Sequence, residues 1–441
     1  MADAHLETAA KLLGGRPGDR DIEEMIAAVR HELAVAISAA IPWPSYDDSV
    51  KSCASRRLRW GLWHADDKSW CELLRRRYAR VREARATQIS ATSAAGGCDS
   101  PPWALPRAGG IPRVIHHIWL GSALPKQFAA LRDTWRRHHP TWRHVLWGDA
   151  EAASFGMRNR AAFDRATNFG EKSDLLRYEV LNRYGGVYVD TDFECTRPLD
   201  ELADSCGFFT GVSNTGTFEL NNGLIGAAAA HPLLEELVRN AASGGASIAG
   251  ATDGGSLQRN KPFRDALRLV VGSGWVDDPS EGAGEPGREG HSAAAVGQER
   301  VQGGGRGGGG GRREPGDVLR SMAMEEASNG CFGGTIERTG PGMFTRTIMS
   351  ALCDAEPEAD GSSSVTSGDS RPLPAAMRSV LVLPCSFFYP MPNDASPRAP
   401  TTGKASSGHG SECEAQSACC LYVKPETFAV HHYARSWQVE Q

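Results

Sequence analysis

The chain has 441 residues, enough for a large buried core and roughly two to three domains by the usual length relation. Hydrophobic residues make up 40% and charged residues 23%, so a disordered chain, a collagen-like chain and a polytopic membrane protein are excluded. The net charge of −5 gives no reason to expect a nucleic acid or an anionic membrane surface as partner.

The sequence shows no recognisable secretory leader, and its apolar run at 33–42 is too short to span a bilayer. By these criteria alone we expect a cytoplasmic protein without a membrane span. The eleven cysteines include no CxxC pair and no zinc-type spacing. We therefore expect reduced thiols at the surface, with lumenal disulfides as the alternative.

The pattern of residues 1–105 predicts a helical N-terminal extension that ends in a linker. Apolar residues recur at helical spacing over 19–40, and a second helix is expected over 68–90. We interpret the basic face of this second helix as solvated, with a patch for an anionic partner as the alternative. Its arginines are Arg75, Arg76, Arg77, Arg80, Arg82 and Arg85.

The remainder, 106–441, is interpreted as one domain in which strands alternate with helices. Strands are expected over 113–120, 142–147, 186–190, 208–212 and 220–226, and helices over 126–138, 171–184 and 232–242. This alternation predicts an α/β fold with a mostly parallel sheet. Low-complexity stretches near 277–316, 354–370 and 395–417 are interpreted as disordered loops inserted in this domain.

The most informative segment, 173–192, begins with a helix that carries two charged groups. Ser173 can cap this helix, and Gly185 can end it with a left-handed residue. Asp174 and Arg177 are three positions apart, so they share one helix face. The helix therefore presents a carboxylate beside a guanidinium.

The same segment continues into a short apolar strand that ends in Asp190-Thr191-Asp192. Ligands of open α/β sheets bind at the carboxyl ends of the strands. Two carboxylates there suit Mn²⁺ or Mg²⁺ with a phosphate-bearing substrate, because these ions prefer hard oxygen ligands. An isolated Asp-x-Asp is usually a surface turn, but the preceding strand and helix favour a site.

The segment 173–192 resembles the DXD-containing region of glycosyltransferase family 32, which includes yeast-type mannosyltransferases and vertebrate N-acetylglucosaminyl- and galactosyltransferases. It is more distantly similar to the glucosylating clostridial toxins. Further support comes from IPRVIHHIWLG at 111–121, TGPG at 339–342, FFYP at 387–390 and AVHHYARSW at 429–437. The resemblance implies a GT-A-type (Rossmann-like) fold for nucleotide-diphospho-sugar transfer. It also implies a UDP- or GDP-linked sugar donor, Mn²⁺ or Mg²⁺, and retention of configuration.

The resemblance also implies roles for individual residues of the donor side. Asp190 would contact the ribose or the sugar, and Asp192 would bind the metal. Asp174 and Arg177 would hydrogen-bond sugar hydroxyls or the diphosphate, and Trp119 would stack on the nucleobase. Asp190, Asp192 and Arg177 are thus the candidate catalytic residues.

Further candidates lie towards the C-terminus and on the acceptor side. His432 is the favoured second metal ligand, with His431 left open. Ser436 and Trp437 lie where the family closes over the diphosphate. Asn222 is expected to contact the acceptor.

These residues together predict a metal-dependent retaining glycosyltransferase that moves a hexose or N-acetylhexosamine onto a glycan, glycolipid or glycoprotein. The mechanism implied by the family requires no catalytic base, since the departing phosphate can accept the acceptor's proton. Catalysis would then depend on positioning and on stabilisation of the leaving group. The family resemblance also implies a Golgi location, in contrast to the cytoplasmic expectation above.

Two alternatives remain at this point. The first is a haloacid-dehalogenase-type phosphatase that uses Asp190 and Asp192, because 187–194 (VYVDTDFE) partly fits its first motif. Glu194, however, stands where that motif has Thr or Val. The second is a non-catalytic relative that binds a sugar or nucleotide sugar without turnover.

Overall fold

The structure, a computed structural model, describes residues 20–53, 60–61, 63–65, 67–92, 110–243, 332–355, 375–393 and 422–434. All of these residues belong to one compact unit of the chain, 1–256 together with 331–441. The linker predicted at the end of the segment 1–105 and the insertions predicted at 277–316 and 395–417 lie outside the described residues. Of the insertion predicted at 354–370, only residues 354 and 355 are described.

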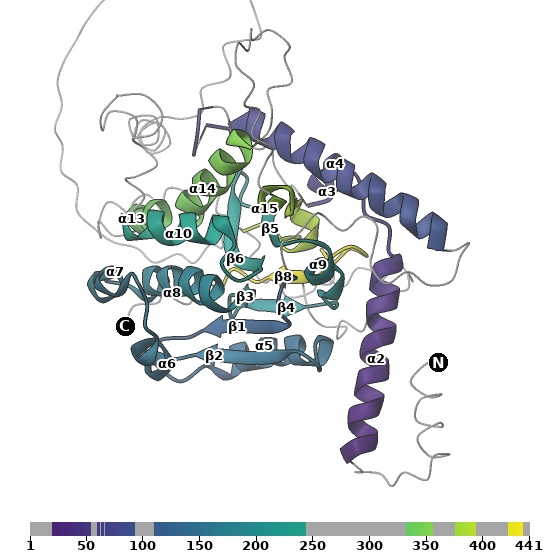
Figure 1. Cartoon of the computed structure of the whole chain (residues 1–441), viewed down its shortest axis with the longest axis horizontal. Helices are drawn as coiled ribbons and strands as arrows, with labels where there is room; N and C mark the ends of the chain where they lie inside the picture. The colour runs from purple at the N-terminus through teal and green to yellow at the C-terminus, as the bar shows by residue number, and fades with distance from the viewer. Residues whose placement is uncertain are drawn as a thin grey trace, which may run out of the picture. The chain divides into compact units, whose positions relative to one another are not determined.

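The centre of this unit is a sheet in the strand order β2-β1-β3-β6-β5-β7 (Figure 1). Its strands are β1 (Val114–Ile118), β2 (Arg143–Trp147), β3 (Gly186–Val189), β5 (Phe208–Val212), β6 (Leu220–Ala227) and β7 (Val380–Leu383). Among these strands β6 runs against the others, since it pairs antiparallel with both β3 and β5 while the remaining pairs are parallel. The predicted α/β class with a mostly parallel sheet is confirmed.

A second, two-stranded sheet was not expected from the sequence. It pairs β4 (Phe193–Cys195) with β8 (Ala429–His431) in antiparallel orientation. Each strand has three residues, too few for a clear alternation of apolar and polar side chains. This small sheet joins the segment after β3 to the C-terminal part of the described chain.

Helices surround the central sheet. Figure 1 shows α8, α10 and α14 beside one another, and the contacts agree. The helices after β1 are α5 (Lys126–His138), α6 (Asp149–Ser154), α7 (Arg160–Arg165), α8 (Phe169–Tyr184), α9 (Asp200–Ser205), α10 (Pro232–Ala242), α13 (Phe332–Arg338), α14 (Pro341–Asp354), α15 (Ala375–Arg378) and the 3₁₀ helix η2 (Cys385–Phe387). Strands β3, β5 and β6 are buried along their whole length, as expected when a sheet is covered on both faces.

The N-terminal helices share this hydrophobic core. They are α2 (Arg20–Ala40), α3 (Tyr46–Cys53) and α4 (Asp67–Thr92), of which α3 was not predicted. Trp43 packs against Tyr78 of α4 and against Phe387 of η2, with ring centroids 6.0 and 5.3 Å apart. The expectation of one solvated arginine face is wrong for Arg85, which is buried and forms an ion pair with Glu201 of α9.

The cysteines also differ from the expectation of surface thiols. Of the six that the structure describes, all free, five are buried and Cys353 is exposed. The same described part of the chain contains no helix long and apolar enough to cross a membrane.

Candidate active site

Helix α8 (Phe169–Tyr184) begins two residues before the predicted start at 171. Asn168, not Ser173, caps it, and the Asn168 side chain accepts a hydrogen bond from the Glu171 amide at 2.8 Å. Gly185 ends the helix with φ +63°, as predicted, and a Cβ there would lie 2.7 Å from the Ala229 nitrogen. The next residues form β3, so the helix end fixes where the strand begins.

The two DXD carboxylates lie where the chain turns from β3 into β4. The Asp190 amide donates to the Gly223 carbonyl of β6 at 2.8 Å, which extends the β3–β6 pairing by one residue. The Phe193 amide then donates to the Asp190 carbonyl at 3.3 Å and closes the turn. Both carboxylates are therefore held at the carboxyl end of β3, where α/β sheets bind their ligands.

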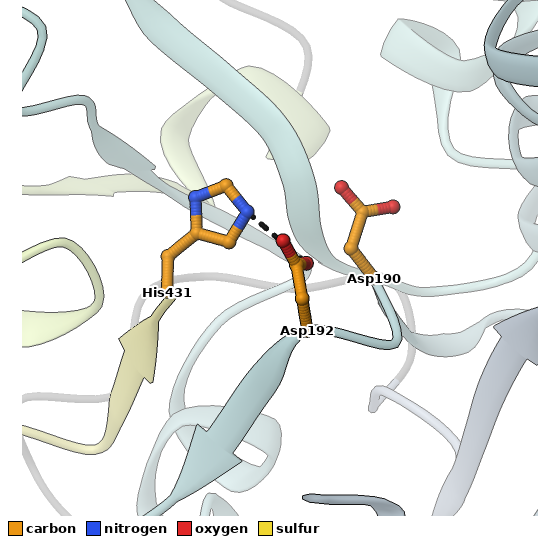
Figure 2. Close-up of side chains that lie close together, drawn as sticks. All are labelled: Asp190, Asp192 and His431. Carbon is orange, nitrogen blue, oxygen red and sulfur yellow. Dashed lines mark ion pairs between the residues drawn. The ribbon is translucent and has the colours of Figure 1, made fainter. Parts of the chain in front are cut away.

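His431 joins these carboxylates to form a three-residue cluster (Figure 2). Its position follows from the small sheet, in which Phe193 pairs with His431. The His431 Nε2 lies 3.2 Å from Asp192 Oδ1, and one potential ligand atom from each of Asp190, Asp192 and His431 lies within 4.8 Å of the others. The imidazole stacks on Phe193 with ring centroids 4.4 Å apart.

The structure thus places His431 at the carboxylates, and not His432, which the sequence analysis favoured. His432 Nε2 is 3.2 Å from Glu194 Oε2, while its backbone amide donates to the Asp192 carbonyl at 3.0 Å. Neighbouring residues on a strand point to opposite faces, so only one of two adjacent histidines can face the turn. Which one does so depends on the register of β8 against β4.

The electrostatic environments of the two aspartates differ. Burial and the nearby Asp192 raise the pKa of Asp190, and the Arg177 guanidinium opposes this. Burial also tends to raise the pKa of Asp192, but His431 and the Ala434 amide, which donates at 2.9 Å, lower it overall. Two carboxylates with an imidazole fit Mn²⁺ or Mg²⁺. The buried His431 Nδ1 has no hydrogen-bond partner among the described residues.

Arg177 connects the DXD turn to helix α8. Its Nη2 lies 3.3 Å from Asp190 Oδ1 and 3.1 Å from Asp174 Oδ1, and its Nη1 donates to the Asn222 carbonyl at 2.8 Å. The guanidinium also stacks over the Tyr188 ring, 4.4 Å from its centroid. Arg177 is therefore a buried cation that neutralises two carboxylates.

Asp174 and Asn222 lie in the same buried network. Asp174 accepts hydrogen bonds from the Asn222 amide at 2.8 Å and from the Thr339 hydroxyl at 3.0 Å. Burial raises the pKa of Asp174 to about 6, although Arg177 opposes the shift. Asn222, expected on the acceptor side, is 4% exposed and also donates to the Tyr178 hydroxyl at 2.9 Å. In the structure it supports Asp174.

Sequence reasoning missed the part that Thr339 plays. The motif TGPG was noticed, but its threonine was given no role. Thr339 lies between α13 and α14, and its carbonyl accepts a hydrogen bond from the Tyr178 hydroxyl at 2.7 Å. The sequence signal that could have indicated it was a threonine directly before a Gly-Pro helix start.

The remaining candidates lie at the same edge of the sheet as the DXD turn or outside the described residues. Trp119 is half-buried just after β1, the parallel neighbour of β3, so it lies at the same edge of the sheet. Its indole donates to Ser122 at 3.1 Å, and its ring packs on Phe128 with centroids 5.1 Å apart. Ser436 and Trp437 lie outside the described residues.

An α/β sheet with paired strand-end carboxylates beside an imidazole defines a candidate metal site. Residues 125–208 match the family model "Glycosyltransferase sugar-binding region containing DXD motif". The chain therefore contains the DXD sugar-binding region of glycosyltransferases, and the resemblance to glycosyltransferase family 32 is confirmed. Residues 187–194, on which the phosphatase alternative depended, lie inside the matched region.

Similar proteins include inositol phosphoceramide mannosyltransferase 1 of Schizosaccharomyces pombe, 32% identical over 137 residues, covering 30% of this chain and 42% of that protein. Mannosyl phosphorylinositol ceramide synthase SUR1 of Saccharomyces cerevisiae is 30% identical over 146 residues, which cover 32% of this chain and 37% of that protein. The chain thus spans about two fifths of the length of these relatives. Among solved structures, the catalytic domain of alpha-toxin from Clostridium novyi matches at TM-score 0.35 and 8% identity, covering 70% and 89%. The PaToxG glycosyltransferase matches at TM-score 0.29 and 17% identity, and the match covers 44% of this chain and 80% of that one.

Proposed function

We propose that the protein is a metal-dependent retaining glycosyltransferase of the GT-A type. It transfers a hexose from a nucleotide-diphosphate sugar to a hydroxyl of a glycan or glycolipid. The observation that carries this proposal is the cluster of Asp190, Asp192 and His431, whose two carboxylates lie at the carboxyl end of β3 inside the matched sugar-binding region.

Each residue of the cluster has a defined task. Asp190, Asp192 and His431 would hold Mn²⁺ or Mg²⁺, and the ion would supply positive charge to neutralise a departing diphosphate. Arg177 holds Asp190 in position from within the protein. The Ala434 amide orients the second oxygen of Asp192.

The transfer itself requires one bond exchange at the anomeric carbon. The bond to the acceptor oxygen forms, the bond to the phosphate oxygen breaks, and the acceptor's proton passes to the departing phosphate on the same face of the sugar. The protein's part is to hold both reactants in alignment and to stabilise the leaving group.

The names of the relatives suggest a substrate pair. Both are named for mannose transfer involving a phosphoinositol ceramide. We therefore propose mannose as the first donor sugar to test, with an inositol-phosphate lipid as the first acceptor. A glycoprotein or a free glycan is the alternative acceptor.

The test combines donor binding with turnover. Nucleotide sugars linked to UDP or GDP are offered with and without Mn²⁺, and the melting temperature is recorded. A ligand at 100 times its Kd stabilises the native state by about 2.7 kcal/mol. We expect stabilisation by one donor only when Mn²⁺ is present, followed by release of the nucleoside diphosphate when acceptor is added. Binding without turnover would favour the non-catalytic alternative.

Asp192→Asn is the decisive variant for the metal site. Removing one carboxylate from the metal set should lower kcat/KM by at least ~100-fold, the scale on which single leaving-group-stabilising contacts act. Asp133→Asn is the matched control, because Asp133 is an exposed carboxylate on α5 that pairs with Arg136. Full Mn²⁺-dependent turnover in Asp192→Asn would show that the metal assignment is wrong.

A further inference from the structure

Strands β5 and β6 bring further polar side chains to the edge of the sheet that carries the DXD turn. Strand β6 runs against both β3 and β5, so it begins at the edge where those two strands end. One residue beyond the pair Val212–Leu220, the Ser213 amide donates to the Glu219 carbonyl at 2.8 Å. Ser213 is thus the cross-strand neighbour of Glu219, and the side chains of such neighbours lie on one face about 5 Å apart.

This face of β6 is the one that meets the DXD carboxylates. Side chains alternate along a strand, so Glu219 and Asn221 point one way and Asn222 the other. A Cβ on Gly223 would lie 2.7 Å from Asp190 Oδ2 and 2.9 Å from Asn221 Oδ1. Asn221, and with it Glu219, therefore faces the metal site. The four residues from Glu219 to Gly223 span at most about 13 Å, which leaves room for a donor sugar between the metal site and Glu219.

Three buried hydroxyls on this side have no hydrogen-bond partner among the described residues: those of Ser213, Tyr389 and Tyr433. The rings of Tyr389 and Tyr433 pack on the His431 imidazole, with centroids 5.7 and 4.2 Å apart. Tyr389 also covers β5, since a Cβ on Gly211 would lie 3.1 Å from its ring. A buried hydroxyl without a partner is costly, so a group of them beside a metal site indicates a ligand that supplies hydrogen bonds.

Glu219 is a buried carboxyl without a cation. It is 8% exposed, and no lysine or arginine of the described chain forms an ion pair with it. By contrast, the buried Glu201 pairs with Arg85, and the buried Glu171 pairs with Arg338. An unpaired buried carboxylate destabilises the fold, so packing alone does not account for an acid at this position.

We propose that Glu219 and Ser213 bind hydroxyls of the acceptor, a polyhydroxylated ring such as a hexose or inositol, next to the donor sugar. This inference rests on the proposed glycosyltransferase function and extends it to the acceptor. The Glu219 carboxylate accepts hydrogen bonds from two adjacent ring hydroxyls, and the Ser213 hydroxyl bonds to the same ring. A carboxylate repels phosphate, so this site recognises the ring and not a phosphate group attached to it.

The first experiment measures acceptor binding without turnover. Saturation-transfer NMR with myo-inositol and with methyl α-mannoside is recorded on the full chain with Mn²⁺ and either UDP or GDP. We expect the unaltered protein to bind at least one probe. Glu219→Gln should weaken that binding about 10- to 100-fold, the effect of losing a hydrogen bond to a charged group, and Ser213→Ala about 2- to 10-fold. Failure of the unaltered protein to bind either probe would overturn the proposal.

The matched controls preserve the proposed contacts. Glu83→Gln neutralises an exposed carboxylate on α4. Thr217→Val removes a hydroxyl from the connection between β5 and β6 that lies 3.1 Å from the Thr215 hydroxyl. Neither control should change probe binding. Because Glu219→Gln removes a buried charge and keeps the side-chain shape, we expect it to fold, which circular dichroism checks.

Steady-state kinetics separates the acceptor role from a structural one. Glu219→Gln should raise KM for the acceptor and leave KM for the donor and the Mn²⁺ affinity unchanged. Unchanged acceptor binding in this variant, or an equal loss of donor and acceptor binding, would overturn the proposal. Turnover by the unaltered protein combined with either of these results would leave the proposed function standing. Probe binding that depends on Glu219 without any turnover would instead contradict the proposed function and retain the acceptor site.

Discussion

At the scale of single residues, the candidate site depends on how buried charges are satisfied. Asp174, Arg177 and Asp190 lie in a row, with one cation between two carboxylates. An isolated buried charge is costly, and removal of one partner leaves the others uncompensated. The side chains of Asn222 and Thr339 donate hydrogen bonds to Asp174. We therefore expect them to affect activity by stabilising the Asp174 carboxylate.

Thr339→Val tests this dependence. Without the hydroxyl donor, the pKa of Asp174 should rise further above about 6, since burial already raises it and only Arg177 and the Asn222 hydrogen bond would still oppose the rise. A protonated Asp174 no longer balances Arg177. The acid limb of the kcat/KM profile for donor use should therefore move to higher pH, and Thr339→Ser should restore it.

A profile that does not move in Thr339→Val would show that the threonine has only a packing role. The groups that face Asp174 are Arg177, Asp190, Asn222 and Tyr178, and all are retained in both variants. The comparison between valine and serine therefore isolates one hydroxyl.

Glu219 offers a second prediction, on stability. Burial raises the pKa of Glu219 to about 7, and the nearby polar groups of Ser213 and Trp63 lower it only in part. Because the folded state binds the proton more tightly than the unfolded state, stability falls as pH rises from about 4.5 to about 7 and stays lower above it. Glu219→Gln should therefore raise the free energy of unfolding at pH 8 by roughly 3 kcal/mol, and have little effect at pH 5.

Urea denaturation at both pH values measures this difference. Glu83→Gln is the control, because Glu83 is an exposed carboxylate on α4 and its neutralisation should change stability little at either pH. An equal effect of Glu219→Gln at pH 5 and pH 8 would contradict the assignment of a buried carboxylate that ionises with difficulty.

At the scale of elements, the pairing of β3 with β6 sets the position of the DXD turn. A Cβ on Gly223 would lie 2.7 Å from Asp190 Oδ2 and 2.9 Å from Asn221 Oδ1. Gly223→Ala should therefore displace the Asp190 carboxylate and weaken Mn²⁺ binding by about 10- to 100-fold, as changes to the groups around metal ligands do. Titration calorimetry measures the affinity, and far-ultraviolet circular dichroism checks the fold.

Gly156→Ala is the matched control for this substitution. A Cβ there would meet only the end of the Arg183 side chain, at 3.9 Å, so neither affinity nor fold should change. An unchanged Mn²⁺ affinity in Gly223→Ala would show that Asp190 is not held by this close approach.

The elements that sequence could predict are those with a repeating pattern. Helices α5 and α10 and strand β5 have the predicted ends, and Gly185 ends α8 as its left-handed conformation requires. Strands β4 and β8 could not be predicted, because three residues carry no periodicity and their partners are distant in the chain. The same distance explains why His431 and His432 could not be distinguished. Asp190 and Asp192, by contrast, were local signals.

At the scale of the whole described unit, the N-terminal helices and the sheet share one hydrophobic core. Trp43, Tyr78 and Phe387 pack against one another across segments that the sequence assigned to different domains. A composition boundary near residue 105 does not reveal such packing, because apolar helix faces look alike whatever they cover. We therefore expect these segments to unfold together.

Arg85→Ala tests this expectation. The buried Arg85 guanidinium pairs with Glu201 of α9 and donates to the Ile41 and Ala39 carbonyls at 2.7 Å each. Its removal leaves Glu201 buried with a more distant cation, Arg197, at 3.8 Å, so stability should fall by about 3–5 kcal/mol. Arg75→Ala, which removes a surface ion pair with Asp47, should cost less than about 1 kcal/mol.

Urea unfolding followed by tryptophan fluorescence and by circular dichroism should give one coincident, shifted transition, because packing links the helices to the sheet. Two separate transitions, with only the helical one shifted by Arg85→Ala, would show instead that the N-terminal helices fold independently.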